Sequence, residues 1–167
     1  GNKYHEDGTF ILSFGGKGSP SPVLAGPTGI ACMGEEIYVA DRTKKTVFVF
    51  DKSGNLLSSF GSDYLLGPEG IHIPQSGVLL IADTAPFAEN TRVVRYDMER
   101  ELFSIHSRFD GLDARAKRLI GVTVDANGDL LACDFNTNRV LMLSEATDLS
   151  SGLFLQIDRI DETNFPQ

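Results

Sequence analysis

The feature that most constrains the fold of this chain is an internal repeat. The stretch IYVADRTKKTVFVFD (37–51) joins two apolar runs through an Asp and a short polar interruption. LLIADTAPFAENTRVVRYD (79–97) and LLACDFNTNRVLMLS (130–144) repeat this arrangement. A regular period of a few tens of residues is typical of architectures whose units stack on one another. Two markers measure the period: Asp41, Asp83 and Asp134 are 42 and 51 residues apart, and Gly29, Gly70 and Gly121 are 41 and 51 apart.

Each repeat predicts four short strands, named A to D here. Strand A begins at the Gly, strand B ends in the Asp, a polar loop leads to strand C, and a tight turn leads to strand D. The runs TVFVF, VLLIA and RVLML are apolar on both faces, which is typical of strands buried between stacked sheets. The turns KSGN and ANGD carry the Gly and Asn that positive φ favours. Four antiparallel strands at a period near 42 residues indicate a β-propeller blade.

The predicted fold class is therefore all-β, a β-propeller of four-stranded antiparallel blades. The stretch DGTFILSFGG (7–16) copies only strand D of the first repeat, SGNLLSSFGS (53–62), so we expect an orphan N-terminal strand at 9–14. Residues 1–167 are expected to form a single propeller segment with a blade remnant (7–16) and three blades (27–62, 68–105 and 119–158). The expected strands are 29–33, 36–40, 46–50 and 55–60; 70–73, 78–82, 92–96 and 101–105; and 121–125, 129–133, 139–143 and 153–157.

Composition and charge narrow the classes of partner. The formal net charge of −8 disfavours a nucleic-acid partner, because phosphate binding needs a cationic footprint. No run of about 18 apolar residues is present, so we expect no membrane span. The polar start, GNKYHEDG, predicts no signal peptide, and its leading Gly suggests an excised segment. Cys32 and Cys133 are expected to be buried free thiols, which favours the cytoplasm over an oxidising compartment.

Residues 24–62 resemble an NHL repeat. They share its Pro-x-Gly-Ile start (27–30), its YVAD at the end of strand B (38–41), and its DxxGxxLxxFG ending (51–61). The second repeat matches at GPEGI and IADT, and the third matches through NRV (138–140), so the resemblance covers roughly residues 7–143. It implies a propeller that usually closes with about six blades, so this chain supplies a partial ring or half of a six-bladed one.

The resemblance leaves three arrangements open: a fragment of a larger propeller, an unusually small propeller, or two chains that close one ring. An unpaired strand edge is an aggregation hazard, so the N-terminal strand needs a blade to join. We therefore expect a homodimer of two three-blade halves, in which the N-terminal strand closes the ring across chains.

The repeated aspartates are interpreted as structural. Each follows strand B, where a carboxylate can accept hydrogen bonds from loop N–H groups. Asp134 precedes Arg139 by five residues and Asp83 precedes Arg92 by nine, so an ion pair across each loop is expected. Three copies in three blades favour structure, since an active site needs one special carboxylate.

Function is expected where the repeats differ. The B-to-C loops and the D-to-A connections emerge on one face of a propeller, and loops carry function on a rigid scaffold. The second B-to-C loop is four residues longer than the others within TAPFAENT (84–91), and HSRFDGLDARAKRLI (106–120) is also long. Cationic and aromatic side chains of this face suit a protein or peptide partner, although a merely solvated set of loops fits as well. The candidate partner-binding residues are Arg42, Lys44, Lys45, Pro86, Phe87, Glu89, Arg115, Lys117 and Arg118.

An enzyme is the alternative. TRVVRYD (91–97) and residues 121–141 are also similar to gluconolactonase and strictosidine-synthase-like propellers, which implies a divalent metal at the channel mouth and a hydrolase or lactonase activity. The matching positions are Thr28, Glu69 and Ile120, and only Glu69 is a hard oxygen ligand. One carboxylate is too few for a calcium site. We therefore expect no catalytic residue, metal or other cofactor, with Glu69 as the one candidate ligand, and a non-catalytic scaffold is the favoured function.

Overall fold

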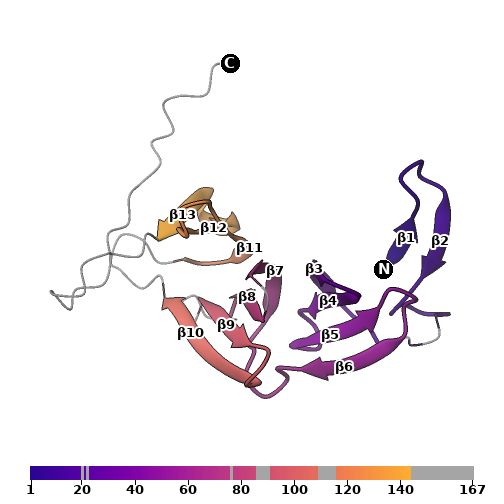
Figure 1. The fold of residues 1–167 in the computed structure, drawn as a ribbon. Coiled ribbons are helices and arrows are strands. Elements are labelled where there is room, and N and C mark those ends of the chain that lie inside the picture. Colours follow the sequence, from indigo (N-terminus) through magenta and orange to yellow (C-terminus); the bar gives the residue numbers. More distant parts are fainter. Residues whose placement is uncertain (20, 22, 76, 86–90, 109–115, 144–167) are drawn as a thin grey trace, which may run out of the picture.

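The computed structural model describes residues 1–19, 21, 23–75, 77–85, 91–108 and 116–143. These form four antiparallel sheets, which confirms the predicted all-β fold class (Figure 1). The N-terminal hairpin pairs β1 (Asn2–Tyr4) with β2 (Phe10–Ser13). Blade 1 contains β3 (Pro27–Met33), β4 (Glu36–Asp41), β5 (Thr46–Asp51) and β6 (Leu56–Phe60). Blade 2 contains β7 (Pro68–Gln75), β8 (Val78–Asp83), β9 (Arg92–Asp97) and β10 (Leu102–Arg108). Blade 3 contains β11 (Leu119–Val124), β12 (Leu130–Asp134) and β13 (Arg139–Leu143), with a 3-10 turn at Phe135–Thr137.

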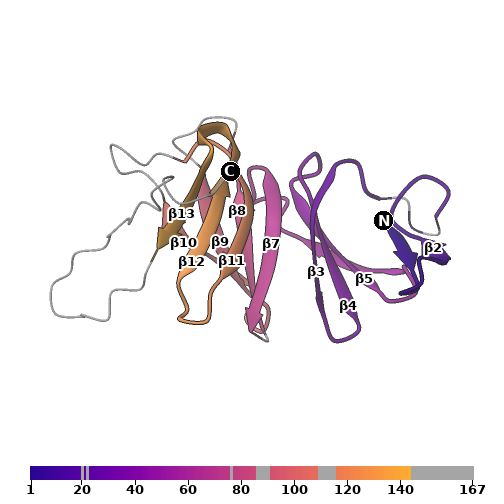
Figure 2. The same cartoon turned by 90° about the horizontal axis from the view of Figure 1, so that it is seen from above.

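The blades fan out from their first strands. Figure 1 shows β3, β7 and β11 on the inner side of the arc and β6 and β10 on the outer side. Seen from above, β7 lies between β3 and β11 (Figure 2), and it contacts both. None of the described residues forms a helix long and apolar enough to cross a membrane.

The hydrophobic core lies between blades, which explains why the central strands are apolar on both faces. Along β8, Leu79 and Ile81 pack against blade 1, whereas Leu80 and Ala82 pack against blade 3. All four side chains are almost inaccessible to solvent. Fully burying a Leu or Ile contributes roughly 1.5–3 kcal/mol, so a blade gains much of its stability only when a neighbour covers it.

Two glycines of the inner strands permit the blades to approach. A Cβ on Gly29 would lie 2.3 Å from the carbonyl oxygen of Glu69, and a Cβ on Gly70 would lie 2.6 Å from that of Ile120. Both distances are far below van der Waals contact, so the backbones of adjacent inner strands touch. Gly121 is the third copy, and a Cβ there would meet nothing closer than the Cys133 sulfur at 3.8 Å. Among the described residues, blade 3 therefore has no inner strand on the side that faces away from blade 2.

Three expectations need revision. The N-terminal strand is not an orphan, because β2 pairs with β1 in a hairpin. The thiols expected to be buried are free and exposed, since Cys32 lies on the side of blade 1 away from blade 2, and Cys133 on the side of blade 3 away from blade 2. For the same reason β13 is only partly buried, with Val140 44% exposed. The strand expected at 153–157, and with it the end of the third blade at 158, lies outside the described residues.

Candidate functional site

The three repeated aspartates tie two loops together in each blade. All three are buried, and each accepts hydrogen bonds from two backbone N–H groups that lie just before strand A. The residue after each Asp donates its own N–H back to that same connection, through Arg42, Thr84 and Phe135 at 2.9 Å each. The B-to-C loop and the D-to-A connection are thereby fastened on one edge of the blade. The donors are Ala25 and Gly26 for Asp41, Leu66 and Gly67 for Asp83, and Lys117 and Arg118 for Asp134, at 2.6 to 3.2 Å.

Two of the aspartates also face an arginine at the start of strand C. Arg92 Nε lies 3.0 Å from Asp83 Oδ2, and its guanidinium stacks on the ring of Tyr64 at 4.7 Å. Arg139 Nη2 lies 3.6 Å from Asp134 Oδ2. Such buried, charge-assisted contacts suit a structural role.

Sequence reasoning missed the main partners of these aspartates. It expected N–H groups of the B-to-C loop, and Asp41 does accept one, from Lys44 at 2.9 Å. The donors before strand A lie 15 to 17 residues earlier in the chain. The available signal was the Gly-Pro pair at the entry to strand A, which occurs at 26–27 and again at 67–68. Two threonines add bonds between blades, from Thr28 Oγ1 to the Pro68 carbonyl (2.9 Å) and from Thr84 Oγ1 to the Leu119 carbonyl (3.0 Å).

The B-to-C loops and D-to-A connections form one face, which we call the loop face. At its inner edge, Arg42 of blade 1 and Arg118 of blade 3 both reach Glu69 of blade 2. Arg42 Nη1 lies 3.3 Å and Arg118 Nε 3.1 Å from the same carboxylate oxygen. The Glu69 side chain is only 5% exposed, whereas those of Arg42 and Arg118 are 40% and 36% exposed. One buried anion thus positions two guanidinium groups that keep donors free towards solvent.

Three further cations lie on the same face. Lys44 and Lys45 lie in the loop after β4, and Lys117 precedes β11; all three are exposed. Within the described parts of the chain, their ammonium groups form no hydrogen bond or ion pair. The loop face therefore carries positive charge on a chain whose net charge is −8.

The opposite face, formed by the A-to-B and C-to-D turns, is acidic and is called the turn face. Hydrogen bonds from turn N–H groups, joined by the Thr9 side chain at Asp7 and the Asn55 side chain at Asp51, lower the pKa values of three of its carboxyls, Asp7, Asp51 and Asp97, below the usual 3.8. The side-chain bond from Asn55 is the largest cause for Asp51, and the Arg100 N–H is the largest for Asp97. Seven carboxylates occupy the described turns against two cations, Lys52 and Arg100: Glu6, Asp7, Glu35, Glu99, Glu101, Asp125 and Asp129. Asp51 and Asp97 end the strands that lead into two of these turns.

Not all candidate partner-binding residues can be placed. Arg42, Lys44, Lys45, Lys117 and Arg118 lie on the loop face. The other four, Pro86, Phe87, Glu89 and Arg115, fall outside the described residues, as do most of the two expansions that first drew attention to this face.

The arrangement around Glu69 does not fit a divalent cation. Its carboxylate already pairs with two guanidinium groups, which would repel a metal ion. No group of three or more His, Cys, Asp or Glu side chains with metal-binding geometry occurs in the described parts of the chain. Thr28 and Ile120, the positions that match Glu69 in the neighbouring blades, add no ligand: the Thr28 hydroxyl is bonded to blade 2, and Ile120 is apolar.

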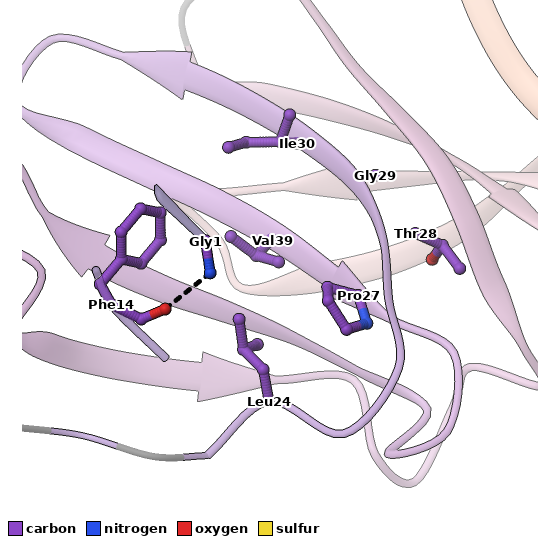
Figure 3. Close-up of a pocket in the computed structure, with 8 residues that line it drawn as sticks. All are labelled: Gly1, Phe14, Leu24, Pro27, Thr28, Gly29, Ile30 and Val39. Atoms are coloured by element: carbon purple, nitrogen blue, oxygen red, sulfur yellow. Dashed lines mark hydrogen bonds between the residues drawn. The ribbon is translucent and has the colours of Figure 1, made fainter. Parts of the chain in front are cut away.

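A second concave feature is apolar and lies away from these charges. It is a pocket of about 220 Å³ between the N-terminal hairpin and the inner strands of blade 1 (Figure 3). Phe14, Leu24, Pro27, Ile30 and Val39 contribute to its wall, and Gly1 N donates to the Phe14 carbonyl at 2.7 Å beside it. No titratable side chain lines it, so the pocket offers packing surface rather than a site for chemistry.

Comparison with known proteins supports the fold and no finer assignment. No protein-family model matches the chain, and no curated protein matches it significantly. Solved structures of propeller-type proteins do match. Virginiamycin B lyase from Staphylococcus aureus aligns with a TM-score of 0.55 at 16% identity, over 72% of this chain and 38% of the lyase. A streptogramin B lyase gives 0.54 at 18%, over 71% of this chain and 37% of the lyase.

A chain from a nidogen/laminin complex aligns with a TM-score of 0.53 at 19% identity, over 73% of this chain and 44% of that chain. The present chain thus spans less than half the length of these propellers. At such identities the likeness shows the fold alone: this chain is a β-propeller segment. The neighbours include both an enzyme and a protein found in a protein complex.

Proposed function

We propose that this chain is an NHL-type propeller segment that acts as a non-catalytic scaffold and binds an acidic segment of a protein or peptide partner on its loop face. The observation that carries the proposal is the separation of charge between the two faces. Exposed cations cluster on the loop face, around the Arg42–Glu69–Arg118 triad, while carboxylates dominate the turn face. Complementary potentials of this kind steer partners and fix their orientation.

The loop-face arginines are suited to recognise carboxylates. Each guanidinium presents several donors in a rigid plane, and Glu69 uses only one from each. Because Glu69 is buried and pairs with both arginines, Arg42 and Arg118 stay in place without a partner, which lowers the cost of ordering them on binding. The candidate residues Pro86, Phe87, Glu89 and Arg115 of the same two loops lie outside the described residues, and their part in binding stays a prediction.

The metal-dependent hydrolase alternative has no comparable support among the described residues, because Glu69 is already committed to two ion pairs.

We also propose that two copies of the chain assemble as a homodimer that completes the ring. Within the part of the chain that the structure describes, no blade covers one apolar side of blade 1 and one of blade 3, where Ile30 and Val140 are exposed. A light-scattering mass of twice 18.2 kDa is the expected result, and a mass of 18.2 kDa would contradict it.

Binding to a fluorescein-labelled poly-glutamate peptide tests the scaffold proposal. The double variant K44E/K45E is expected to weaken binding roughly tenfold or more, since each reversed surface charge alters the interaction by up to about 1 kcal/mol. Lys52→Glu provides the matched control, because it makes the same change on the turn face and should leave binding unaltered. Affinity should also fall as salt is raised.

Two results would overturn the proposal. One is equal loss of binding in K44E/K45E and Lys52→Glu, which would show that only net charge matters. The other is a preference for a single-stranded RNA of the same charge over the peptide, which would replace the acidic protein partner with a nucleic acid.

A further inference from the structure

The two ends of the described arc carry unpartnered apolar surface. Of the exposed large apolar side chains in the described residues, most lie on these two ends, and the others lie on the outer strands. We call the surface of blade 3 that faces away from blade 2 the C-end face, and the hairpin together with the uncovered side of β3 the N-end face. The C-end face includes Ile120, Phe135 and Val140, and the N-end face includes Tyr4, Phe10 and Ile30.

The C-end face repeats a surface that is buried elsewhere in the same molecule. Val140 pairs with Cys133 just as Val47 pairs with Ala40 and Val93 with Ala82. Val47, Ala40, Val93 and Ala82 are all 0% exposed, because the next blade covers them. In blade 3 the valine is 44% exposed and the cysteine is exposed as well.

Gly121 shows what kind of element belongs there. Its equivalents Gly29 and Gly70 each contact a carbonyl of the next blade, that of the residue just before the inner-strand glycine there (Glu69 before Gly70, and Ile120 before Gly121). The open space beside Gly121 therefore fits the backbone of another inner strand. The carbonyl of the residue just before that strand's own glycine would lie against Gly121.

The N-end face offers such a strand. Ile30 on β3 is 61% exposed, although its equivalents Ile71 and Val122 in the other blades are 9% and 8% exposed against the preceding blade. Phe14, at the end of the hairpin, packs against Phe50 with ring centroids 5.2 Å apart, in a cluster that includes side chains of β4 and β5 and none of β3. The hairpin leaves the inner strand free beside the pocket in Figure 3. The hairpin itself exposes Tyr4 and Phe10, whose ring centroids are 5.8 Å apart.

We propose that the N-end face of a second copy docks on the C-end face, with β3 of that copy against β11 and its hairpin against β13. The contact continues the relation between blades 1 and 2 and between blades 2 and 3, so the same chain supplies both halves of a head-to-tail interface. This inference specifies the proposed homodimer and does not depend on the binding of acidic partners. The docking also makes a prediction about the two cysteines. Cys32 lies on the N-end face and Cys133 on the C-end face, so docking buries both.

The experiment combines solution mass with thiol labelling of the full chain. In the wild-type protein at the concentration where its mass is twice 18.2 kDa, both thiols should react with a maleimide roughly tenfold or more slowly than in urea. Ile30→Asp and Val140→Asp each place a charge in one end face and should give monomers with both thiols reactive. Because both side chains are already exposed, circular dichroism should show an unchanged fold. Leu57→Asp, at a site 53% exposed on β6, is the matched control and should keep the dimer.

Mixing the two monomeric variants distinguishes a head-to-tail contact from a symmetric one. Ile30→Asp retains an intact C-end face and Val140→Asp an intact N-end face, so the mixture should regain dimers through one native interface. A wild-type mass of 18.2 kDa, dimers that survive both substitutions, or a mixture that stays monomeric would each overturn the inference. Slow thiol labelling in a monomer would do so too, since it would assign the cover to the chain itself. Val140→Asp should still bind poly-glutamate, which separates this test from that of the loop face.

Discussion

The contact between inner strands makes a sharp prediction about two equivalent glycines. Gly70→Ala would place a Cβ 2.6 Å from the Ile120 carbonyl oxygen and 2.7 Å from the Gly121 Cα. Gly121→Ala would place its Cβ no closer than 3.8 Å to any described atom. Neither glycine has a positive φ, so the substitutions differ in crowding and not in backbone strain. The difference in stability between Gly70→Ala and Gly121→Ala therefore measures the cost of crowding the backbone contact between blades.

The size of the effect follows from the overlap. A carbon and an oxygen separated by 2.6 Å must move apart by a few tenths of an ångström or more, and both neighbours are backbone atoms of strands held in sheets. Overpacking of this kind costs about 1–3 kcal/mol, and the rigidity of both partners favours the upper half of that range. Gly→Ala without a clash stabilises by about 0.4–1 kcal/mol, because it reduces the entropy of the unfolded chain. The two variants should therefore differ by about 3 kcal/mol, with opposite signs.

Urea unfolding followed by circular dichroism measures the difference, and it should be run in the Val140→Asp background so that assembly does not contribute. A loss of 2–3 kcal/mol in Gly70→Ala corresponds to roughly 4–12 °C in Tm for a chain of this size. The slope of free energy against urea must stay constant for the comparison to hold. Equal stability of Gly70→Ala and Gly121→Ala would refute the idea that backbone contact between inner strands sets the blade spacing. In the wild-type background, Gly121→Ala should also weaken assembly if a second copy docks there.

Two further predictions concern carboxylates on the two faces. Asp83→Ala leaves Arg92 and two backbone N–H groups buried without their partner and should lower the free energy of unfolding by about 3–5 kcal/mol, measured in urea, whereas Asp63→Ala, exposed on the loop face, should change it little. On the turn face, hydrogen bonds hold the pKa of Asp51 below 3.8, so its folded pKa lies under its unfolded one. Its contribution is complete above about pH 3.8 and is lost as the pH falls through the folded value. Asp51→Asn should therefore flatten the fall in urea midpoint below pH 4; an unchanged slope would contradict the assignment.

The repeat allowed the fold class and the central strands to be predicted, because the Asp and Gly markers recur with the same local sequence. It did not reveal β1, whose three residues, NKY, carry no marker and become a strand only by pairing with β2. The repeat also could not predict that Cys133 is exposed. The residue occupies the position of two buried alanines, and its burial depends on a neighbouring blade that the local sequence does not specify.

The candidate site, too, could be predicted from the sequence only in part. The cationic loop residues could be proposed from sequence, since loop positions follow from the strand pattern. The convergence of Arg42 and Arg118 on Glu69 could not, because these residues come from three blades and meet only through the packing of inner strands. From the sequence alone, Glu69 was the one candidate metal ligand. Its two arginine partners change it into an anchor for positive charge.

The fold explains one of the two charged faces and not the other, and this asymmetry is the strongest guide to function. On the turn face, carboxylates such as Asp51, Asp97 and Asp125 accept N–H groups of their own turns, so their negative charge follows from the chemistry of tight turns. On the loop face, Lys44 and Lys117 use only backbone atoms to bind the buried aspartates, and their ammonium groups have no partner among the described residues. Any residue type with a backbone N–H could fill those two positions. Positive charge that stability does not require, gathered beside a preorganised pair of arginines, is most simply explained by a negatively charged partner.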